Sequence, residues 1–410
     1  MIVEWPKKKL GELAEICRGS SPRPITDTRF FDGGTVPWVK IADATKSGKF
    51  LYETKQHIND FGASFSRRLP PGTILVAASG TLGYTQILGV EGCAHDGWLI
   101  LQNLRGLDRD FAYYALKTLE QHFFNSGSGA AIQNINTDIL RESEVPCPPL
   151  RVQQRIAGIL SAYDELIENS QRRIKILETM ARALYREWFV HFRFPGHENH
   201  PRIASALGQI PKGWELQKLG QLCSKLMDGT HDSPPPVEAG FPLITGRHIK
   251  GGFIDFSDAY QISPEEHQKV MNRSRPENGD IIYSNIGTLG ATAIVDQEFE
   301  FSIKNVALLK PITRAHSSFL YCHLEAPEKL SEMTTKASGT SQKFFSLQFL
   351  RHLELVVPPE KLIEQFSEKL TPVLRSRSLL MKGIQNLRRT RDLLLPRLLS
   401  GQVSLEALEP

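Results

Sequence analysis

The amino-acid sequence predicts an α+β protein with two globular α/β domains joined by two long helices, which pair as an antiparallel coiled coil. Two observations predict this fold class. Short strings of sequence recur at an offset of about 205–210 residues in a chain of 410, and each half ends in a long apolar heptad pattern. A repeat this long indicates two whole modules rather than the small units of a solenoid. We therefore expect an internal repeat with pseudo-twofold symmetry.

The recurring strings follow the same order in both halves. Each half has a Lys-Leu-Gly string near its start, a glycine-bounded turn in its middle and a proline pair before its long helix. The paired strings are residues 9–13 (KLGEL) and 218–222 (KLGQL), 80–83 and 287–290 (both GTLG), 128–129 and 338–339 (both SG), 140–141 and 350–351 (both LR), and 148–149 and 358–359 (both PP). Two copies of one module indicate two copies of one task.

Composition indicates a globular chain. Hydrophobic residues make up 40% and charged residues 23%, which supplies apolar material for two cores and argues against disorder. No apolar run could span a bilayer and residues 1–6 lack a signal-peptide pattern, so we expect a cytoplasmic protein without a membrane partner. Five scattered cysteines favour reduced thiols over disulfides or a zinc site. The net charge of +4 permits a nucleic-acid partner without requiring one.

The first globular domain is expected over residues 1–147. Residues 73–78 and 84–88 are rich in strand formers and flank a glycine-bearing turn. Residues 111–123 place apolar side chains on one helical face, with Asp110 as the expected N-cap. The loops are long and rich in Gly, Ser and Pro, and such loops on a rigid scaffold often carry binding residues.

The second globular domain is expected over residues 214–357. Residues 280–284 and 291–295 repeat the two strands, and a weaker helical pattern lies at 319–324. Pro, Gly and polar residues dominate residues 192–213, which we interpret as the linker between the halves.

Two long helices are predicted, at residues 148–191 and 358–403, followed by a tail at 404–410. Apolar residues alternate at spacings of three and four, which is a coiled-coil seam. The alternative is two unrelated amphipathic helices, each packed on its own domain. The matched seam residues are Ile156, Leu160, Tyr163, Ile167, Ile174, Leu177, Leu184 and Trp188 in the first helix, and Phe366, Leu370, Val373, Leu380, Ile384, Leu387, Leu394 and Leu398 in the second.

Two features disturb the second helix. Arg377 and Arg391 fall on seam positions between the apolar residues. Pro372 lacks an N–H and clashes with the preceding turn, so it is expected to kink or divide the helix. About 40 helical residues would otherwise give a rod of roughly 60 Å.

Catalytic motifs are missing from the sequence. It has no P-loop and no Asn/Asp-Pro-Pro-aromatic tetrad for base methylation; residues 233–236 (SPPP) fail at both ends. The histidines of residues 197–200 (HENH) are three apart in a Pro/Gly-rich segment, whereas the metal motif needs them four apart on a helix. His95-Asp96 has no nucleophile to serve and is interpreted as a satisfied polar pair. The sequence therefore predicts a non-catalytic binding chain with no metal site.

Several longer strings carry a resemblance to a known family. They are residues 393–403 (LLLPRLLSGQV), 184–190 (LYREWFV) with 194–197 (FPGH), 207–214 (LGQIPKGW) and 228–231 (DGTH). On these strings the chain resembles, over essentially its whole length, the specificity subunit of type I restriction–modification systems. Two departures are Pro372 within the second helix and a first domain that starts almost at Met1, with no N-terminal segment before it.

The resemblance implies a division of labour. Each globular domain would be a target recognition domain that reads one half of a bipartite site on double-stranded DNA. The long helices would set the gap between the half-sites and dock two methyltransferase subunits. No cofactor is implied for this chain; S-adenosylmethionine, ATP and Mg are implied on the methyltransferase and restriction/translocase subunits.

Candidate DNA contacts are basic side chains near loops, which could bind phosphates, and amide, imidazole or guanidinium groups, which could read base edges. The glycine-bounded turns could let backbone approach a phosphate, or they could reflect hairpin geometry alone. The candidates are Lys40, Arg67, Arg68, Gly80, Thr81, Asn134, Asn136, His231, Arg247, His248, Lys250, Asn285, Thr288, Gln342 and Lys343.

Two alternatives belong to other functional classes. A stand-alone DNA-binding regulator, or a decoy that sequesters a methyltransferase, would use the same modules without forming a working enzyme. A self-contained nuclease or methyltransferase with a degenerate site is disfavoured because the motifs are missing.

Overall fold

The computed structural model describes residues 5–45, 47–128, 134–206, 208–336 and 343–403. The chain forms two compact units: unit 1 combines residues 1–171 with 383–410, and unit 2 holds residues 172–382. Both boundaries fall inside the two long helices, because each helix contributes one part to each unit. The predicted linker, residues 192–213, therefore lies wholly within unit 2.

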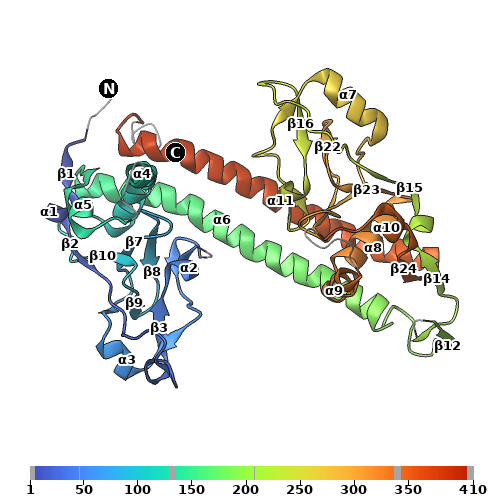
Figure 1. Ribbon diagram of the computed structural model, residues 1–410, viewed down its shortest axis with the longest axis horizontal. Coiled ribbons are helices and arrows are strands. Elements are labelled where there is room, and N and C mark those ends of the chain that lie inside the picture. The colour runs from blue at the N-terminus through green and yellow to red at the C-terminus, as the bar shows by residue number, and fades with distance from the viewer. Residues whose placement is uncertain (1–4, 46, 129–133, 207, 337–342, 404–410) are drawn as a thin grey trace. The chain divides into compact units, whose positions relative to one another are not determined.

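Unit 1 is built on two sheets (Figure 1). The larger sheet contains, in spatial order, β2 (Glu15–Arg18), β10 (Trp98–Gln102), β7 (Ile74–Ala77), β8 (Thr85–Leu88) and β4 (Phe50–Leu51). The smaller sheet contains β5 (His57–Ile58), β3 (Val36–Val39), β9 (Gly92–Ala94) and β6 (Arg68–Leu69). A separate pair joins β1 (Lys7–Lys9) to β11 (Glu144–Pro146). The helices are α1 (Leu10–Leu13), α2 (Ile41–Ala44), α3 (Asp60–Ser64), α4 (Arg109–Ser128) and α5 (Thr137–Glu142), with a 3-10 turn η1 (Thr28–Phe30).

The start of α4 differs from the sequence prediction. Asp108, rather than Asp110, accepts a hydrogen bond from the backbone N of Phe111 at 2.9 Å. Asp110 instead forms a salt bridge with Lys49 at 2.7 Å. The sequence could not separate the two aspartates, because both precede the same apolar face and the partner of Asp110 is distant in sequence.

Unit 2 repeats this architecture with additions. Its larger sheet contains, in spatial order, β15 (Cys223–Asp228), β23 (Ala307–Pro311), β20 (Ile281–Tyr283) and β21 (Thr292–Ile294). A smaller sheet contains β19 (Gln261–Ile262), β16 (Phe241–Ile244) and β22 (Ser302–Ile303). Separate strand pairs join β17 (Ile249–Lys250) to β18 (Phe253–Ile254), and β14 (Glu215–Lys218) to β24 (Glu354–Val357). The helices are α7 (Pro264–Arg273), α8 (Arg314–Glu325), α9 (Pro327–Thr335) and α10 (Leu347–His352), with 3-10 turns η3 (Leu219–Leu222) and η4 (Gly246–His248).

The internal repeat is confirmed in strand order and in individual hydrogen bonds. β2–β10–β7–β8 corresponds to β15–β23–β20–β21, and β5–β3–β9 corresponds to β19–β16–β22. The guanidinium of Arg141 donates to the carbonyl of Ile16 at 2.8 Å, and that of Arg351 donates to the carbonyl of Leu226 at the same distance. The arginines of the recurring Leu-Arg strings therefore fix α5 to β2 and α10 to β15.

The segment predicted as a linker forms a hairpin, β12 (Arg202–Ser205) and β13 (Gly208–Pro211). The hairpin and its flanks contribute to the core of unit 2, where Phe194, Ile210 and Trp214 are buried. Composition suggested a spacer because Pro, Gly and polar residues surround these three apolar anchors.

The two long helices are α6 (Leu150–Tyr185), which continues as a π-helical turn η2 (Arg186–Val190), and α11 (Glu360–Leu399). α11 runs unbroken through Pro372, so the prediction that this proline divides the helix is wrong. Apolar packing on both sides of the proline holds the helix together, since Phe366 and Leu370 before it and Val373 and Leu374 after it pack in the core of unit 2.

Within each unit α6 and α11 pack antiparallel. In unit 1, Asp164 of α6 forms a salt bridge with Arg391 of α11 at 2.5 Å, and Leu398, further along α11, packs in one core with Leu160, nearer the start of α6. In unit 2 the rings of Trp188 and Phe366 lie 5.8 Å apart. The helices therefore pair with each other and do not pack only on separate domains.

None of the predicted seam residues is exposed. By contrast, Leu166, Ile176 and Leu379, which lie off the seam, are 55–60% exposed. The buried seam residues are Ile156, Leu160, Ile167, Ile174, Trp188, Phe366, Leu370, Ile384 and Leu398, and the half-buried ones are Tyr163, Leu177, Leu184, Val373, Leu380, Leu387 and Leu394.

The two arginines on seam positions have different polar partners. Arg377 is 7% exposed and donates to the hydroxyl of Tyr321 at 2.5 Å and to the carbonyl of Gly252 at 2.7 Å. Arg391 pairs with Asp164. A buried cation is tolerated when it is paired or hydrogen-bonded in this way, which the heptad pattern alone does not reveal.

Across the part of the chain that the structure describes, no helix is long and apolar enough to cross a membrane. Among the same residues, no group of three or more His, Cys, Asp or Glu side chains is placed so that it could hold a metal ion. The five cysteines are free.

Candidate nucleic-acid interface

In the first module, one edge of the smaller sheet gathers polar loops. β3 and β9 run parallel, so Lys40 and His95, which follow these strands, lie at the same edge. The ammonium of Lys40 lies 4.6 Å from the centre of the Trp38 ring, and the ring of His95 lies 5.4 Å from the same tryptophan. Trp38 is fully buried and anchors both side chains.

The glycine-bounded turn adjoins this edge. The backbone N of Ile135 donates to the carbonyl of Ala78 at 2.9 Å, which brings Asn134 beside the turn that follows β7. A Cβ on Gly97 would lie 3.2 Å from Nδ1 of His95 and 3.4 Å from Oγ of Ser79, so the two loops are in contact. Four predicted contact residues, Lys40, Gly80, Thr81 and Asn134, thus share one face of the module.

The two glycines of the turn have different tasks. Gly83 has φ +77°, and a Cβ there would lie 2.8 Å from the ring of Phe123, so packing requires a glycine. Gly80 has φ +71°, and a Cβ there would meet nothing within 4 Å. Hairpin geometry and packing therefore account for Gly83, whereas the backbone at Gly80 is open to a ligand.

Two arginines that the sequence reasoning missed belong to this face. Arg18 donates from Nε to the carbonyl of Asp96 at 2.7 Å, and Arg23 forms a salt bridge with the carboxylate of Asp96. Burial lowers the pKa of His95, and the cations of Lys40, Arg23 and Arg18 lower it further against the opposing effect of Asp96. His95 is therefore uncharged at neutral pH, and because its Nδ1 accepts from the backbone N of Gly97 at 2.9 Å, its Nε2–H is the group it can donate.

Other predicted residues of the first module lie elsewhere or are already engaged. Arg68 is on β6, near the start of β9, and pairs with Asp60 at 3.0 Å and Glu91 at 3.5 Å. Arg67, beside it, is exposed. Asn136 caps α5, because its side-chain oxygen accepts from the backbone N of Ile139 at 2.8 Å and from that of Asp138.

The second module forms the same edge with different side chains. Thr230 N donates to the carbonyl of Ile303 at 3.0 Å, as Ser20 N donates to that of Ala94 at 3.1 Å in the first module. β16 and β22 run parallel, so Arg247 and Lys304 follow neighbouring strand ends. Lys304, which sequence reasoning missed, takes the place that His95 has in the first module.

Three predicted residues lie on this edge. His231 is exposed, and its Nδ1 lies 2.9 Å from Oδ1 of Asn305. Arg247 is exposed, and its guanidinium contacts Nε2 of His248 and the backbone carbonyl of Asp258, each at 3.3 Å. Thr288 is exposed in the turn after β20.

Two predicted residues are buried. His248 is fully buried, its Nδ1 accepts from the backbone N of Thr245 at 2.8 Å, and burial lowers its pKa. Asn285 is 3% exposed and donates from Nδ2 to the carbonyl of Phe345 at 3.0 Å. Both side chains brace loops and do not face solvent, so neither can read a base edge here.

The last three predicted residues differ in setting. Lys250 is exposed and pairs with Asp255 at 2.8 Å. Lys343 is exposed, next to the bridge between Ile286 and Phe344, and so lies beside the turn after β20. Gln342 falls outside the described residues.

Comparison with known proteins assigns the modules to a family. Residues 2–179 and 211–387 each match the type I restriction modification DNA specificity domain. The chain belongs to this family. The two matched segments coincide with the two repeats, so the family pattern is carried twice, once by each half.

Similar proteins span the whole chain. The type I restriction enzyme MjaIX specificity subunit of Methanocaldococcus jannaschii is 25% identical over 419 residues, which cover 99% of this chain and 95% of that protein. The HindI specificity subunit of Haemophilus influenzae is 22% identical over 331 residues, 66% of this chain and 71% of that protein. The crystal structure of a type I restriction–modification S subunit from M. genitalium superposes with a TM-score of 0.63 at 19% identity, covering 97% of this chain and 96% of that one, which shows a shared fold.

Proposed function

We propose that this chain is the DNA sequence-specificity subunit of a type I restriction–modification complex, and that each globular module reads one half of a bipartite site on double-stranded DNA. It is a non-catalytic subunit. Family membership supports the proposal, as do the names of the similar proteins, which are specificity subunits.

One observation carries the proposal of two half-sites. The two modules keep the same backbone hydrogen bonds around their loop edge but present different side chains there. Lys40 and His95 in the first module are replaced by Thr245 and Lys304 at the corresponding strand ends of the second. A backbone scaffold that is kept while the side chains at its edge change suits two readers of different sequences, because phosphate contacts position a protein on DNA and side chains at base edges select the sequence.

The long helices are proposed to set the gap between the half-sites and to dock two methyltransferase subunits. α6 and α11 each contribute to both units, so they tie the modules together through continuous helix. Ile176, Met180 and Leu379 project off the seam with 52–60% of their surfaces exposed. Ile176 and Met180 are one turn apart on α6, and contiguous exposed apolar side chains are typical of a protein-binding surface.

The remaining parts of the complex follow from this assignment. We propose that S-adenosylmethionine binds the methyltransferase subunits, and that ATP and Mg are used by restriction/translocase subunits. The chain itself would need no cofactor and would act in the cytoplasm.

The proposal is tested by a methylation map. The chain is co-expressed with its neighbouring methyltransferase subunit, and the host genome is sequenced for methylated adenine. A single split motif that appears only when the chain is present is the expected result. An assembled complex that adds no methylation would contradict the proposal and would instead favour a decoy that sequesters the methyltransferase.

A further inference from the structure

A buried lysine links the first globular module to the long helices within unit 1. The side chain of Lys49 is 7% exposed and forms a salt bridge with Asp110 of α4 at 2.7 Å. Its ammonium also donates to Oγ of Ser161 on α6 at 2.7 Å. The rings of Tyr114, Tyr113 and Phe50 lie 4.8, 5.5 and 5.6 Å from it and shield it from water.

The contacts continue from α6 to α11. The hydroxyl of Tyr114 donates to Oδ2 of Asp164 at 2.5 Å, and Oδ1 of the same carboxylate pairs with Arg391 at 2.5 Å. Burial and the neighbouring Asp164 raise the pKa of Tyr114, so its hydroxyl remains a donor. We call Lys49, Tyr114, Ser161, Asp164 and Arg391 the clamp; it joins the module to both long helices.

Four residues of the clamp, Lys49, Ser161, Asp164 and Arg391, line a cleft of about 610 Å³ at the module–helix junction. Beside it an apolar seat, in which Phe111 and Leu116 of α4 pack in one core with Leu160 of α6 and Leu398 of α11, also holds the module on the helices. Apolar contact is non-directional and tolerates small rotations, whereas charge-assisted hydrogen bonds weaken steeply when their geometry changes. The apolar seat therefore holds the module against the long helices, and the clamp fixes the angle between the module and the helices.

Unit 2 has its own polar junction built from other residues. Arg377 of α11 holds the hydroxyl of Tyr321 and the carbonyl of Gly252, both in the globular module. Asp296 of the same module pairs with Lys382 of α11 at 3.1 Å and accepts from Ser378. Two modules that place polar bonds at the same junction with unrelated residues indicate that the junction serves the shared task of the modules.

We propose that the clamp fixes the rotation of the first module on the helix pair and thereby makes the complex strict about the gap between the two half-sites. The proposal rests on the proposed function. One added base pair moves a half-site by about 3.4 Å along the DNA and turns it by about 35°. A module held at one angle cannot follow that turn, while a module that rocks on its apolar seat can. The clamp members are positioning residues and need not touch DNA.

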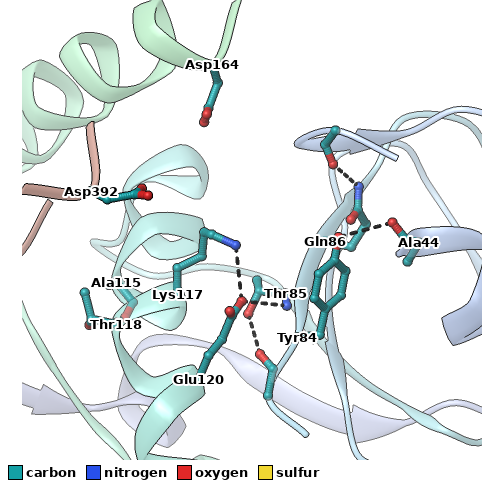
Figure 2. Close-up of polar contacts among 12 residues, drawn as sticks. Ala44, Tyr84, Thr85, Gln86, Ala115, Lys117, Thr118, Glu120, Asp164 and Asp392 are labelled. Carbon is teal, nitrogen blue, oxygen red and sulfur yellow. Dashed lines mark hydrogen bonds and ion pairs between the residues drawn. The ribbon is translucent and has the colours of Figure 1, made fainter. Parts of the chain in front are cut away.

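Two variants test the clamp. Lys49→Met removes the buried cation while keeping most of the side-chain volume. Tyr114→Phe removes only the hydroxyl that reaches Asp164, so it keeps the ring packing and carries the test if Lys49→Met fails to assemble. The matched control is Lys117→Met, because Lys117 lines the same cleft but pairs with Glu120 on its own helix at 3.3 Å. Figure 2 shows that pair, with Asp164 unconnected to it.

The readout is methylation by the complete complex of DNA substrates whose gaps run from two base pairs shorter to two longer than the natural one. We measure the ratio of methylation at gaps one base pair too short or too long to methylation at the natural gap, and we expect both clamp variants to raise this ratio by about fivefold or more. A loss of one or two kcal/mol of angular restraint would produce a change of this size. Half-site sequences should not change, and Lys117→Met should keep the wild-type preference.

Three results would overturn the clamp. The variants could keep the wild-type gap preference, they could lose methylation at every gap alike, or the control could relax the preference as much as they do. A wild-type complex that yields no split motif would instead refute the proposed function itself, so the two failures are distinguishable.

Discussion

Replacing Phe366 by alanine tests the pairing of α6 with α11 in unit 2. Phe366 is fully buried on α11. Its ring lies 4.7 Å from that of Phe189, 5.8 Å from that of Trp188 and 6.4 Å from that of Tyr185, all on the segment formed by α6 and its π-helical extension. The substitution therefore removes the aromatic contact through which the second helix meets the first.

The expected loss follows from the burial. A phenylalanine buries about 150–250 Å², and at roughly 25 cal/mol per Å² this is worth about 4–6 kcal/mol. Buried Phe→Ala changes cost about 3–5 kcal/mol once partial collapse of the cavity is included. Because the aromatic neighbours are rigid and close-packed, collapse is limited, and we expect a loss of about 4 kcal/mol in the free energy of unfolding.

The assay is urea unfolding followed by tryptophan fluorescence, since Trp188 and Trp214 both belong to the core of unit 2. The matched control is Leu379→Ala on the same helix, where the side chain is 60% exposed and the expected change is within about 0.5 kcal/mol. A loss below about 1 kcal/mol for Phe366→Ala would refute the helix pairing, because a cost that small is that of an ordinary partly exposed site.

Three further predictions concern charge, pH and capping. Lys40→Met should weaken DNA binding to a similar degree on all sequences and should reduce the number of counterions released on binding by about one, which binding titrations at several salt concentrations measure. A loss of affinity confined to one DNA sequence would contradict a phosphate contact. Burial lowers the pKa of His323 to about 3, so the stability that the neutral imidazole contributes is complete above pH 6.5 and is lost as pH falls, by up to about 1.4 kcal/mol per pH unit. Unfolding of the His323→Gln variant at several pH values should show a smaller dependence of stability on pH. An unchanged dependence would contradict the assignment of this pKa to His323. Asn136→Ala should cost about 1 kcal/mol as a lost helix cap, with DNA affinity unchanged, and a loss of affinity at unchanged stability would show instead that it reads DNA.

The long helices could be predicted from the sequence because their signal is local and repeated. Residues such as Ile156 and Leu160 recur at heptad spacing, and no distant contact is needed to recognise the seam. Pro372 misled the same reasoning, because the cost of a proline in a helix is set by the residue type, whereas the packing of Phe366 and Leu370 that offsets it is set by the fold.

The interface could be predicted only in part. Residue type and loop position predict Lys40 and Asn134, which lie on one face of the first module, but the placement of Arg18 and Arg23 on that face depends on Asp96, which is distant in sequence and is brought close by sheet pairing. His248 shows the opposite error. A histidine in a loop suggests base recognition, yet this one is fully buried against Thr245, and burial is not visible in residue type.

Domain exchange tests whether each module reads one half of the site. Residues 1–147 are replaced by the corresponding domain of another member of the family, the hybrid is co-expressed with the methyltransferase, and the methylated motif is mapped. We expect one half-site to change while the other half-site is retained. A motif that changes in both halves, or in neither, would contradict this expectation.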